Sequence, residues 1–398
     1  MAELESFPFL TGPRGCPHER YAQRRDSDPL GRVRLPSGDV VTLATRYDDV
    51  VAVLSDPRFS RNLHYPGAPR MFEGYNIADS PGSLMNTDPP EHTRLRRLLS
   101  GTFTPRQVST WRPRLRALTH ELIDRLPATF DLVADLAFPL PVQMICDVMG
   151  VAGIDTERVR GWSDAMLSTS SLTSEEKLAA ATEFYHYAAD LIAAHREDPG
   201  DGLLAAMIEA RDEGDRLSQD ELVRMTVGLF LAGHETTGSV LARSMLRLLD
   251  PRESYERLVA APELIPTAVE ELLRLETPGE GTMIRVATED IELPSGTVGK
   301  GEGIIAAFVG ANNDPSVFPE PRTMVLDRKG PQHITFGRGA HFCLGANLAR
   351  MELQEILGVL VDRLPGLTLT EPADTLPWTT GNLVHRPVRL PVRKTGGT

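Results

Sequence analysis

The sequence predicts one large, mostly helical domain with a small β-rich lobe, spanning residues 1–398. Helical periodicity of apolar residues dominates from Glu91 to the middle of the chain, whereas short extended segments lie near the start and in the last third. No linker, low-complexity block or internal repeat divides the chain. A single domain of this length can bury a core large enough to enclose a cofactor.

The expected elements follow each other in a simple order. The first part should hold strands at 33–35 and 40–43, a short helix at 48–54 and a long loop at 56–87. The pair Thr104-Pro105 is typical of a helix start, and several helices are expected between residues 156 and 215. Strand-like segments return at 282–287, 303–309 and 384–392.

The clearest prediction is a helix from about Ser218 to Leu249. Ser218 and Glu221 form a capping-box pattern at its start, and the Asp250-Pro251 pair ends it. At 1.5 Å per residue this helix is about 48 Å long. A helix of that length must cross the whole domain.

Composition excludes several classes of protein. The formal net charge of -13 argues against a nucleic-acid partner, because phosphate binding needs a basic face. Three widely separated cysteines are too few for a disulfide framework or a structural zinc site. The N-terminus is acidic rather than a signal peptide, and no apolar run approaches the ~20 residues that span a bilayer. We therefore expect a soluble, cytoplasmic monomer.

Cys343 lies in a loop punctuated by glycines, which runs directly into a helical pattern. Leu344, Leu348 and Met351 recur at helical spacing after it. The loop thus presents a thiol just before a helix N-terminus, where free N–H groups and the helix dipole favour a thiolate. A thiolate in such a place is a strong axial ligand for haem iron. The alternative is a small buried hydrophobic residue, the usual role of a lone cysteine.

A second group of polar residues lies in the middle of the long helix, at Gly233, Glu235 and Thr236. An acid and a hydroxyl in an otherwise apolar stretch need partners. Gly233 costs about 1 kcal/mol relative to alanine in a helix and leaves room for a flat group beside the backbone. The alternative for Thr236 is a hydrogen bond back to the preceding turn of its own helix.

Two further pairs of charged residues share helix faces. His92 and Arg96 are four residues apart and point the same way. Glu271 and Arg274 are three residues apart on a later helix. As surface charges, either pair would contribute little.

The segment 336–350 has the pattern Phe-Gly-x-Gly-x-His-x-Cys-x-Gly-x-x-Leu-Ala-Arg. It closely resembles the haem-binding loop of the cytochrome P450 family, and 232–237 resembles that family's oxygen-activation motif. The resemblance covers nearly the whole chain and implies the haem-thiolate monooxygenase fold around haem b. It implies that Cys343 is the axial iron ligand, and that Thr236 and Glu235 are catalytic and deliver protons. It implies a haem-binding set consisting of His92, Arg96, Ala232, Gly233, Arg285, Phe336, His341, Cys343 and Gly345.

The resemblance also implies roles for the remaining motifs. His92, Arg96, Arg285 and His341 would bind the two haem propionates, which call for cationic donors. Glu271 and Arg274 would form a buried, structural pair that bonds toward the 313–328 segment. The implied reaction inserts one oxygen atom from O2 into a largely apolar small molecule, by hydroxylation or epoxidation, in bacterial secondary metabolism.

Electrons must come from other proteins. The chain has no glycine-rich dinucleotide fingerprint, no flavin domain and no iron–sulfur cysteine cluster. A ferredoxin and a ferredoxin reductase are the implied partners. The basic residues expected to receive an acidic ferredoxin are Arg94, Arg97, Arg106 and Arg338.

The family's substrate-lining regions map to apolar and aromatic side chains in this chain. They include Tyr65, Met71, Phe72, Tyr75, Met85, Met166, Met283, Trp378 and Leu383. Two other functions stay open: a haem-thiolate enzyme that couples aromatic units without inserting oxygen, and a non-enzymatic haem sensor. Neither needs the acid–alcohol pair Glu235–Thr236, so its presence weighs against both.

Overall fold

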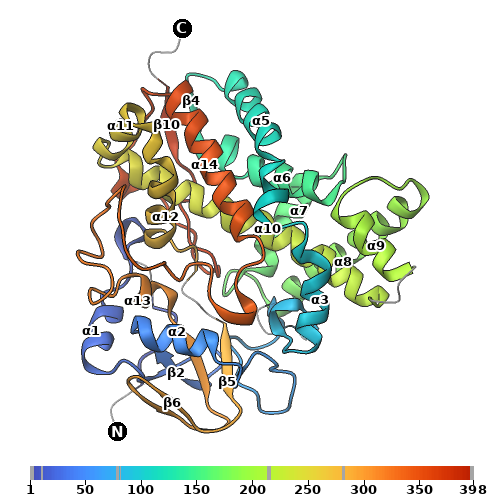
Figure 1. The fold of residues 1–398 in the computed structure, drawn as a ribbon, viewed down its shortest axis with the longest axis vertical. Coiled ribbons are helices and arrows are strands. Elements are labelled where there is room, and N and C mark those ends of the chain that lie inside the picture. Colours follow the sequence, from blue (N-terminus) through green and yellow to red (C-terminus); the bar gives the residue numbers. More distant parts are fainter. Residues whose placement is uncertain are drawn as a thin grey trace.

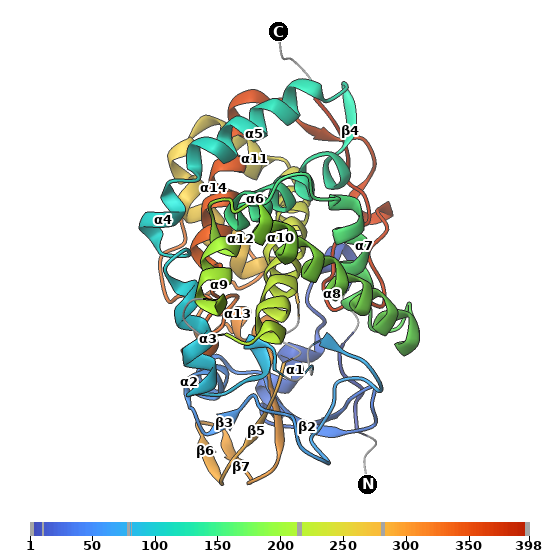
Figure 2. The same ribbon diagram turned by 90° about the vertical axis from the view of Figure 1, so that its right-hand side faces the viewer.

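Helices form the larger part of the molecule, and a sheet lobe built from the first and the last third of the chain lies at one end (Figures 1 and 2). The structure is a computed structural model that describes residues 4–9, 12–77, 80, 82–212, 217–279 and 283–394. The mostly helical fold with a small β lobe is the one that the sequence predicts.

Fourteen α-helices are found in the described ranges. They are α1 (Arg20–Ser27), α2 (Tyr47–Ser55), α3 (Glu91–Ser100), α4 (Pro105–Ser109), α5 (Arg112–Arg125), α6 (Pro139–Met149), α7 (Thr156–Met166), α8 (Ser174–Glu197), α9 (Leu203–Asp212), α10 (Gln219–Leu249), α11 (Glu253–Ala260), α12 (Ile265–Leu275), α13 (Phe308–Asn312) and α14 (Ala346–Arg363). Short 3-10 turns and one π-helical turn, η4 (Val133–Ala137), connect some of them.

The strands form three sheets in the described part of the chain. The largest has the order β1-β2-β8-β5-β3, in which only β2 and β8 run parallel. A three-stranded sheet has the order β4-β10-β9, and β6 pairs with β7. The strands are β1 (Arg32–Arg34), β2 (Val40–Ala44), β3 (Phe59–Ser60), β4 (Thr129–Asp131), β5 (Ile284–Ala287), β6 (Ile291–Leu293), β7 (Gly296–Val298), β8 (Gly303–Ala306), β9 (Thr368–Leu369) and β10 (Pro391–Arg393).

The long central helix α10 confirms the clearest prediction from the sequence. It has 31 residues and crosses the middle of the molecule in both views (Figures 1 and 2). Ser218 caps its start in a capping box with Glu221, and the helix ends at Leu249 before Asp250. It packs against α6, α7, α8 and η4. Any side chain in its centre is therefore fixed by packing on several sides.

Two predicted strands are shorter than expected. The expected 303–309 strand ends at Ala306, because its neighbour β2 ends at Ala44, and α13 begins at Phe308. The predicted 384–392 strand overlaps the observed strand β10 only at residues 391 and 392. Pro387 interrupts the rest of the predicted strand, because proline has no N–H to donate to a neighbouring strand. The start of the predicted 282–287 strand, Thr282, lies outside the described residues.

Buried apolar side chains gather in three clusters. The largest fills the helical body, and the other two lie on the sheet lobe. No helix within the described ranges is both long enough and apolar enough to cross a bilayer. The candidate site lies where α10 and the segment before α14 come together within the helical body.

Candidate active site

The loop that carries Cys343 is fixed by its own backbone. The Cys343 N–H donates to the Phe336 carbonyl at 2.8 Å, which closes the loop on itself. Gly337 and Gly339 have φ values of 68° and 69°, a left-handed conformation that favours glycine. A Cβ on Gly339 would lie 2.4 Å from the Leu54 carbonyl oxygen. The thiol is therefore placed by main-chain geometry just before Gly345, the N-cap of α14.

The Cys343 side chain lies in a recess rather than on the outer surface. It keeps accessible surface, yet surrounding protein atoms are dense enough that burial raises the pKa of its thiol. The Gly345 N–H and the cations Arg96 and Arg350 act in the opposite direction on that pKa and favour the thiolate. The guanidinium of Arg350 also lies 4.5 Å from the ring centre of Phe336, which holds the loop against α14.

One face of α10 also keeps accessible surface in the middle of the molecule. Ala232 and Thr236, four residues apart, are exposed, whereas Glu235 and Thr237 beside them are buried. The Thr236 hydroxyl donates to the Ala232 carbonyl at 3.1 Å. The hydrogen bond back to the preceding turn is thus formed, and the hydroxyl oxygen keeps lone pairs with which it can accept another.

Gly233 serves helix packing. A Cβ at this position would lie 2.7 Å from the Ile145 side chain of α6. The absence of a side chain at Gly233 therefore allows α10 to approach α6 closely. A Cβ at this position would point toward α6. The physical reason for a glycine here differs from the one expected from the sequence, which was room for a flat group.

Glu235 and His234 are both buried in α10. Burial raises the pKa of Glu235 to about 6, although the nearby Arg386 opposes this shift. Burial lowers the pKa of His234 to about 4, and its Nδ1 lies 2.6 Å from the Phe230 carbonyl oxygen. His234 is therefore neutral at pH 7 and packs in the interior, whereas Glu235 can exchange a proton near neutral pH.

Two arginines and two histidines that the sequence singled out converge on one place. The rings of His92 and His341 lie 4.3 Å apart, and Arg96 donates to the Phe342 carbonyl at 2.7 Å. Burial lowers the pKa of His341 to about 3, and the charges of Arg285, His92 and Arg96 contribute. Segments that are far apart in the sequence thus bring two guanidinium groups and two imidazole rings together beside the Cys343 loop.

This cluster lacks matching negative charge in the described structure. Asp88 is the carboxylate that raises the pKa of both His92 and Arg285. His92 is 2% exposed, and its Nε2 has no hydrogen-bond partner among the described residues. Arginines and buried imidazole donors of this kind call for an acceptor that carries negative charge, and a carboxylate suits them.

Arg61 is a member of this cluster that the sequence reasoning missed. Its side chain is 1% exposed, it donates to the Met85 carbonyl at 3.0 Å, and its charge contributes to the lowered pKa of His341. Arg61 follows directly on strand β3, which pairs with β5, the strand that carries Arg285. No local pattern marks it, because its role depends on this long-range pairing.

Glu271 and Arg274 form the buried pair that the sequence predicts. Two parallel hydrogen bonds of 2.8 Å join them, and each side chain is 2% exposed or less. Arg274 also donates to the carbonyls of Asn312 and Pro321, and Glu271 accepts from Arg328. The pair therefore anchors α12 to the segment that precedes the Cys343 loop.

The expected substrate-lining residues fall into different surroundings. Met71 and Phe72 belong to the core of the sheet lobe, and Met166 lies in the helical core. Tyr65 and Met283 are exposed, by 41% and 42%. Only part of the expected set therefore borders accessible space. Residues 78, 79, 81 and 280–282 within the expected regions lie outside the described residues.

The connection between α7 and α8 is held from two sides. Thr169 donates its N–H to Gly381 at 2.7 Å, and Leu383 donates to Leu167 at 2.9 Å. On the other side, the Ser174 hydroxyl donates to the Glu73 carbonyl at 3.3 Å. The α7–α8 connection is thus joined both to a C-terminal turn and to the loop of residues 62–87.

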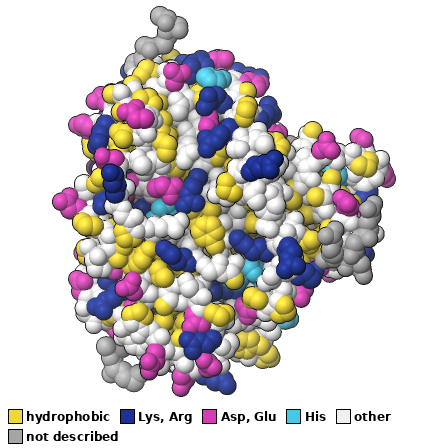
Figure 3. All heavy atoms as spheres, viewed as in Figure 1, with side chains coloured by type: hydrophobic (Ala, Val, Ile, Leu, Met, Phe, Trp, Pro, Cys, Tyr) yellow, Lys and Arg dark blue, Asp and Glu magenta, His cyan; other side chains and the backbone are white. Residues whose placement is uncertain are grey.

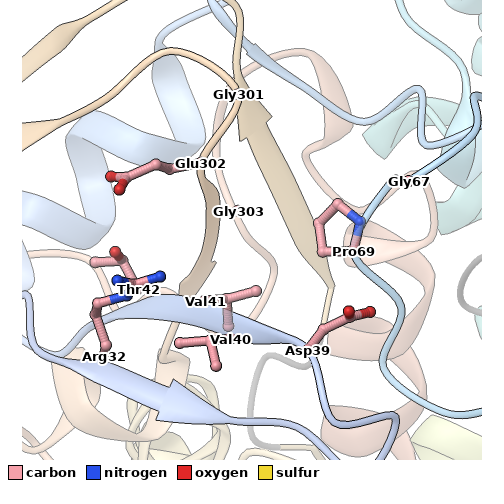
Figure 4. A pocket seen from close by; sticks show the side chains of 10 residues that line it. All are labelled: Arg32, Asp39, Val40, Val41, Thr42, Gly67, Pro69, Gly301, Glu302 and Gly303. Atoms are coloured by element: carbon pink, nitrogen blue, oxygen red, sulfur yellow. The ribbon is translucent and has the colours of Figure 1, made fainter.

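Figure 4 shows a cavity in the sheet lobe, between β1, β2 and β8. Its volume is about 240 Å³, and Arg32, Asp39 and Glu302 are the charged side chains that line it. None of the predicted site residues lines this cavity.

Comparison with known proteins identifies the family. The cytochrome P450 family model matches residues 166–389. The mycinamicin IV hydroxylase/epoxidase of Micromonospora griseorubida is 44% identical over 98% of this chain and 99% of that protein. The nocardicin C N-oxygenase of Nocardia uniformis subsp. tsuyamanensis is 42% identical over 98% of each. The chain belongs to the cytochrome P450 family.

Solved structures agree with this assignment. The structure of HinD with NMFT and NO superposes with a TM-score of 0.93, at 40% identity and over 99% of this chain and 100% of HinD. The LnmA cytochrome P450 hydroxylase from the leinamycin pathway of Streptomyces atroolivaceus gives 0.89 at 43% identity, over 98% of this chain and 100% of LnmA. This P450 is an oxygen-inserting monooxygenase that uses haem b and O2, acts on a small molecule and depends on redox partners.

The residues present fit haem b. Its two propionates would supply the anionic partner that the cluster around His92 calls for. The Cys343 thiolate is a suitable axial ligand, and the accessible faces at Cys343 and at Ala232 and Thr236 can border a flat group. Phe336 and Gly345 flank the thiol on its own loop.

Proposed function

We propose that Cys343 is the axial ligand of haem iron in this P450, and that Glu235 and Thr236 supply protons on the opposite face. Two observations support this proposal: an accessible thiol just before the N-terminus of α14, and an accessible Ala232–Thr236 face in the middle of α10, a helix that packs against α14. His92, Arg96, Arg285 and His341 hold the propionates. Haem b supplies the activation of O2 when it is bound.

The protein's own chemistry in this proposal is proton delivery. Glu235 is buried, and its pKa of about 6 allows it to hold a proton or release it near neutral pH. The Thr236 hydroxyl donates to Ala232 and can accept a hydrogen bond from the substrate side. Glu235 is therefore the proton reservoir, and Thr236 is the group that presents the proton at the reacting atoms.

The reduced, carbon-monoxide-bound spectrum tests the ligand. Wild-type protein should show the red-shifted Soret band of a haem thiolate, and Cys343→Ser should lose that shift while its haem content is measured separately. Cys146→Ser is the matched control, because Cys146 is buried in α6 and should leave the shift unchanged. A wild-type spectrum without the shift would overturn the proposal.

We propose a bulky, largely apolar natural product as the substrate. Named relatives act on mycinamicin IV and nocardicin C, and the apolar and aromatic set around Met283 and Tyr65 suits such a molecule. A panel of macrolides and peptide-derived compounds should be screened for spin-state shifts of the haem. Turnover of a binder under ¹⁸O2 should then add one labelled oxygen atom. Loss of two hydrogens without label would favour the coupling reaction instead, and no turnover would favour a sensor.

We propose a ferredoxin, supplied by a ferredoxin reductase, as the redox partner. Lys and Arg side chains gather over the face where α5, α14 and α3 lie in Figure 1 (Figure 3). Of the four expected contact residues, Arg97 and Arg106 are exposed. Arg94 instead pairs with Glu91 and Glu221, and Arg338 donates to the Tyr47 hydroxyl. The docking site therefore depends on Arg97 and Arg106 more than on the other two.

A single domain over residues 1–398, a monomeric state and a cytoplasmic location remain predictions from the sequence. Sedimentation of the holoprotein with and without ferredoxin would test the monomeric state. A dimer that persists at low concentration would contradict it.

A further inference from the structure

The buried acid Glu235 is linked to the protein surface through one arginine. Arg386 Nε lies 3.3 Å from Glu235 Oε1, and an outer nitrogen of the same guanidinium lies 3.5 Å from Asp164 Oδ1. The exposed fractions of these side chains are 1% for Glu235, 7% for Arg386 and 40% for Asp164. The three groups thus form a line from the centre of α10 to solvent beside α7.

Arg386 is held in one orientation by its surroundings. Its guanidinium lies 4.3 Å from the ring centre of Phe138. Its backbone N–H donates to the Thr379 hydroxyl at 3.1 Å, and its carbonyl accepts from the Thr379 N–H at 2.9 Å. Because this guanidinium is fixed, it restricts the position of the Glu235 carboxylate more than a mobile surface arginine could.

The charged groups that face Glu235 come from three segments. They are Arg386 of the C-terminal segment, Arg160 and Asp164 of α7, and His234 of its own helix, which is neutral at pH 7. Ser239 donates to Glu235 Oε1 at 3.4 Å. Glu235 Oε2 has no partner among the described residues, so Arg386 and Ser239 hold one oxygen and leave the other to carry a proton.

We propose that Arg386 is the positioning residue of Glu235, and that Asp164 marks the solvent end of the path by which protons reach it. Glu235 gives a proton toward Thr236 and regains one from water at Asp164. Arg386 stays protonated throughout and orients the two carboxylates. This inference rests on the proposed role of Glu235 as the distal acid.

Arg386 and Asp164 have opposite electrostatic effects on the pKa of Glu235. The charge of Arg386 lowers the pKa of Glu235, and the charge of Asp164 raises it. Arg386→Gln should therefore raise the pKa of Glu235 above about 6, so that the acid is protonated at pH 7. Asp164→Asn should lower it, and Arg386→Lys should restore most of the wild-type value.

Infrared titration of the holoprotein measures this pKa directly. The carboxylic acid band of Glu235 is identified by its loss in Glu235→Gln. Glu157→Gln is the matched control, because Glu157 is an exposed acid in the same helix as Asp164. Unchanged titration in both Arg386→Gln and Asp164→Asn would overturn the inference. If Arg386→Gln fails to fold, the substitution at the half-exposed Asp164 still decides the case.

The solvent isotope effect on product formation provides a second readout. Asp164→Asn should enlarge this effect and divert O2 to hydrogen peroxide, whereas Glu157→Gln should do neither. If Glu235→Gln itself leaves the isotope effect and the peroxide yield unchanged, the proposed function of Glu235 fails. If Glu235→Gln alters both and the Asp164 and Arg386 variants alter neither, only the relay fails.

Discussion

Single residues in this P450 acquire their roles from backbone and packing rather than from their side-chain type alone. Thr226 and Thr236 lie in the same helix and make the same hydrogen bond to the carbonyl four residues earlier, to Leu222 and Ala232. Thr226 is completely buried, whereas Thr236 is exposed. Accessibility, and not hydrogen bonding, distinguishes the two.

This contrast gives a matched pair of variants. Thr236→Ala should reduce coupled product formation on the order of 100-fold, because positioned proton transfer contributes at least that much. Electrons should then appear as hydrogen peroxide, which is measured against substrate oxidised. Thr226→Ala should lower thermal stability and leave the ratio of product to peroxide unchanged. Equal ratios in the two variants would contradict the role of Thr236.

Neighbouring arginines in α3 offer a second comparison. Arg96 lies in the cationic cluster, whereas Arg97 is exposed. Arg96→Gln should weaken haem binding about 10- to 100-fold, since a hydrogen bond to a charged group contributes about 1.5–3 kcal/mol. Transfer of haem to an excess of an apo-acceptor measures the effect. Arg97→Gln should retain haem like the wild type, and equal loss in both would refute the assignment.

At the scale of elements, local signals predicted α10 well. The capping box at Ser218 and the Asp250-Pro251 stop are short-range patterns, and the helix begins and ends within one residue of them. The 303–309 strand was predicted too long because its end depends on β2, a strand some 260 residues earlier in sequence. Local chemistry can mark a helix end, but the length of a strand depends on its partner.

The next prediction concerns the contact between α12 and the segment before the thiol loop. Glu271→Gln should destabilise the fold by about 3–5 kcal/mol, because it leaves the buried Arg274 and the partly buried Arg328 without their anion. Lower melting temperature and a smaller haem-containing fraction measure this. Glu270→Gln should cost much less, since Glu270 is 40% exposed. A larger loss for Glu270→Gln would show that the Glu271 pair is not the anchor.

At the scale of the whole molecule, the contacts that could not be predicted from the sequence are those between residues far apart in the chain. Glu235 was predicted because its motif is local, but its partner Arg386 is 151 residues away. Arg61 donates to the carbonyl of Ile284, 223 residues along the chain. No spacing rule joins such residues, since the fold alone brings them together. The fold class, the thiol loop and most of the cationic cluster follow from contiguous motifs.

The exposed basic face with Arg97 and Arg106 allows a test of the proposed docking of ferredoxin. Combined Arg97→Glu and Arg106→Glu substitutions should slow reduction by ferredoxin about tenfold at low salt and weaken its salt dependence, because steering by charge is lost. Stopped-flow reduction measures both. Arg34→Glu is the control, since Arg34 is exposed on β1 in the sheet lobe. Equal rates in all three proteins would rule out docking at this face.

The C-terminal turn has a consequence that reaches across the active site. Gly381 and Leu383 form backbone hydrogen bonds with the α7–α8 connection, and Arg386, a few residues later, donates a hydrogen bond to Glu235. Asp164, at the other end of the relay, lies in α7 itself. A substrate large enough to displace the α7–α8 connection would therefore pull on both anchors of the acid. If the proposed relay holds, we therefore expect a poorly fitting molecule to waste reducing equivalents as well as to bind weakly.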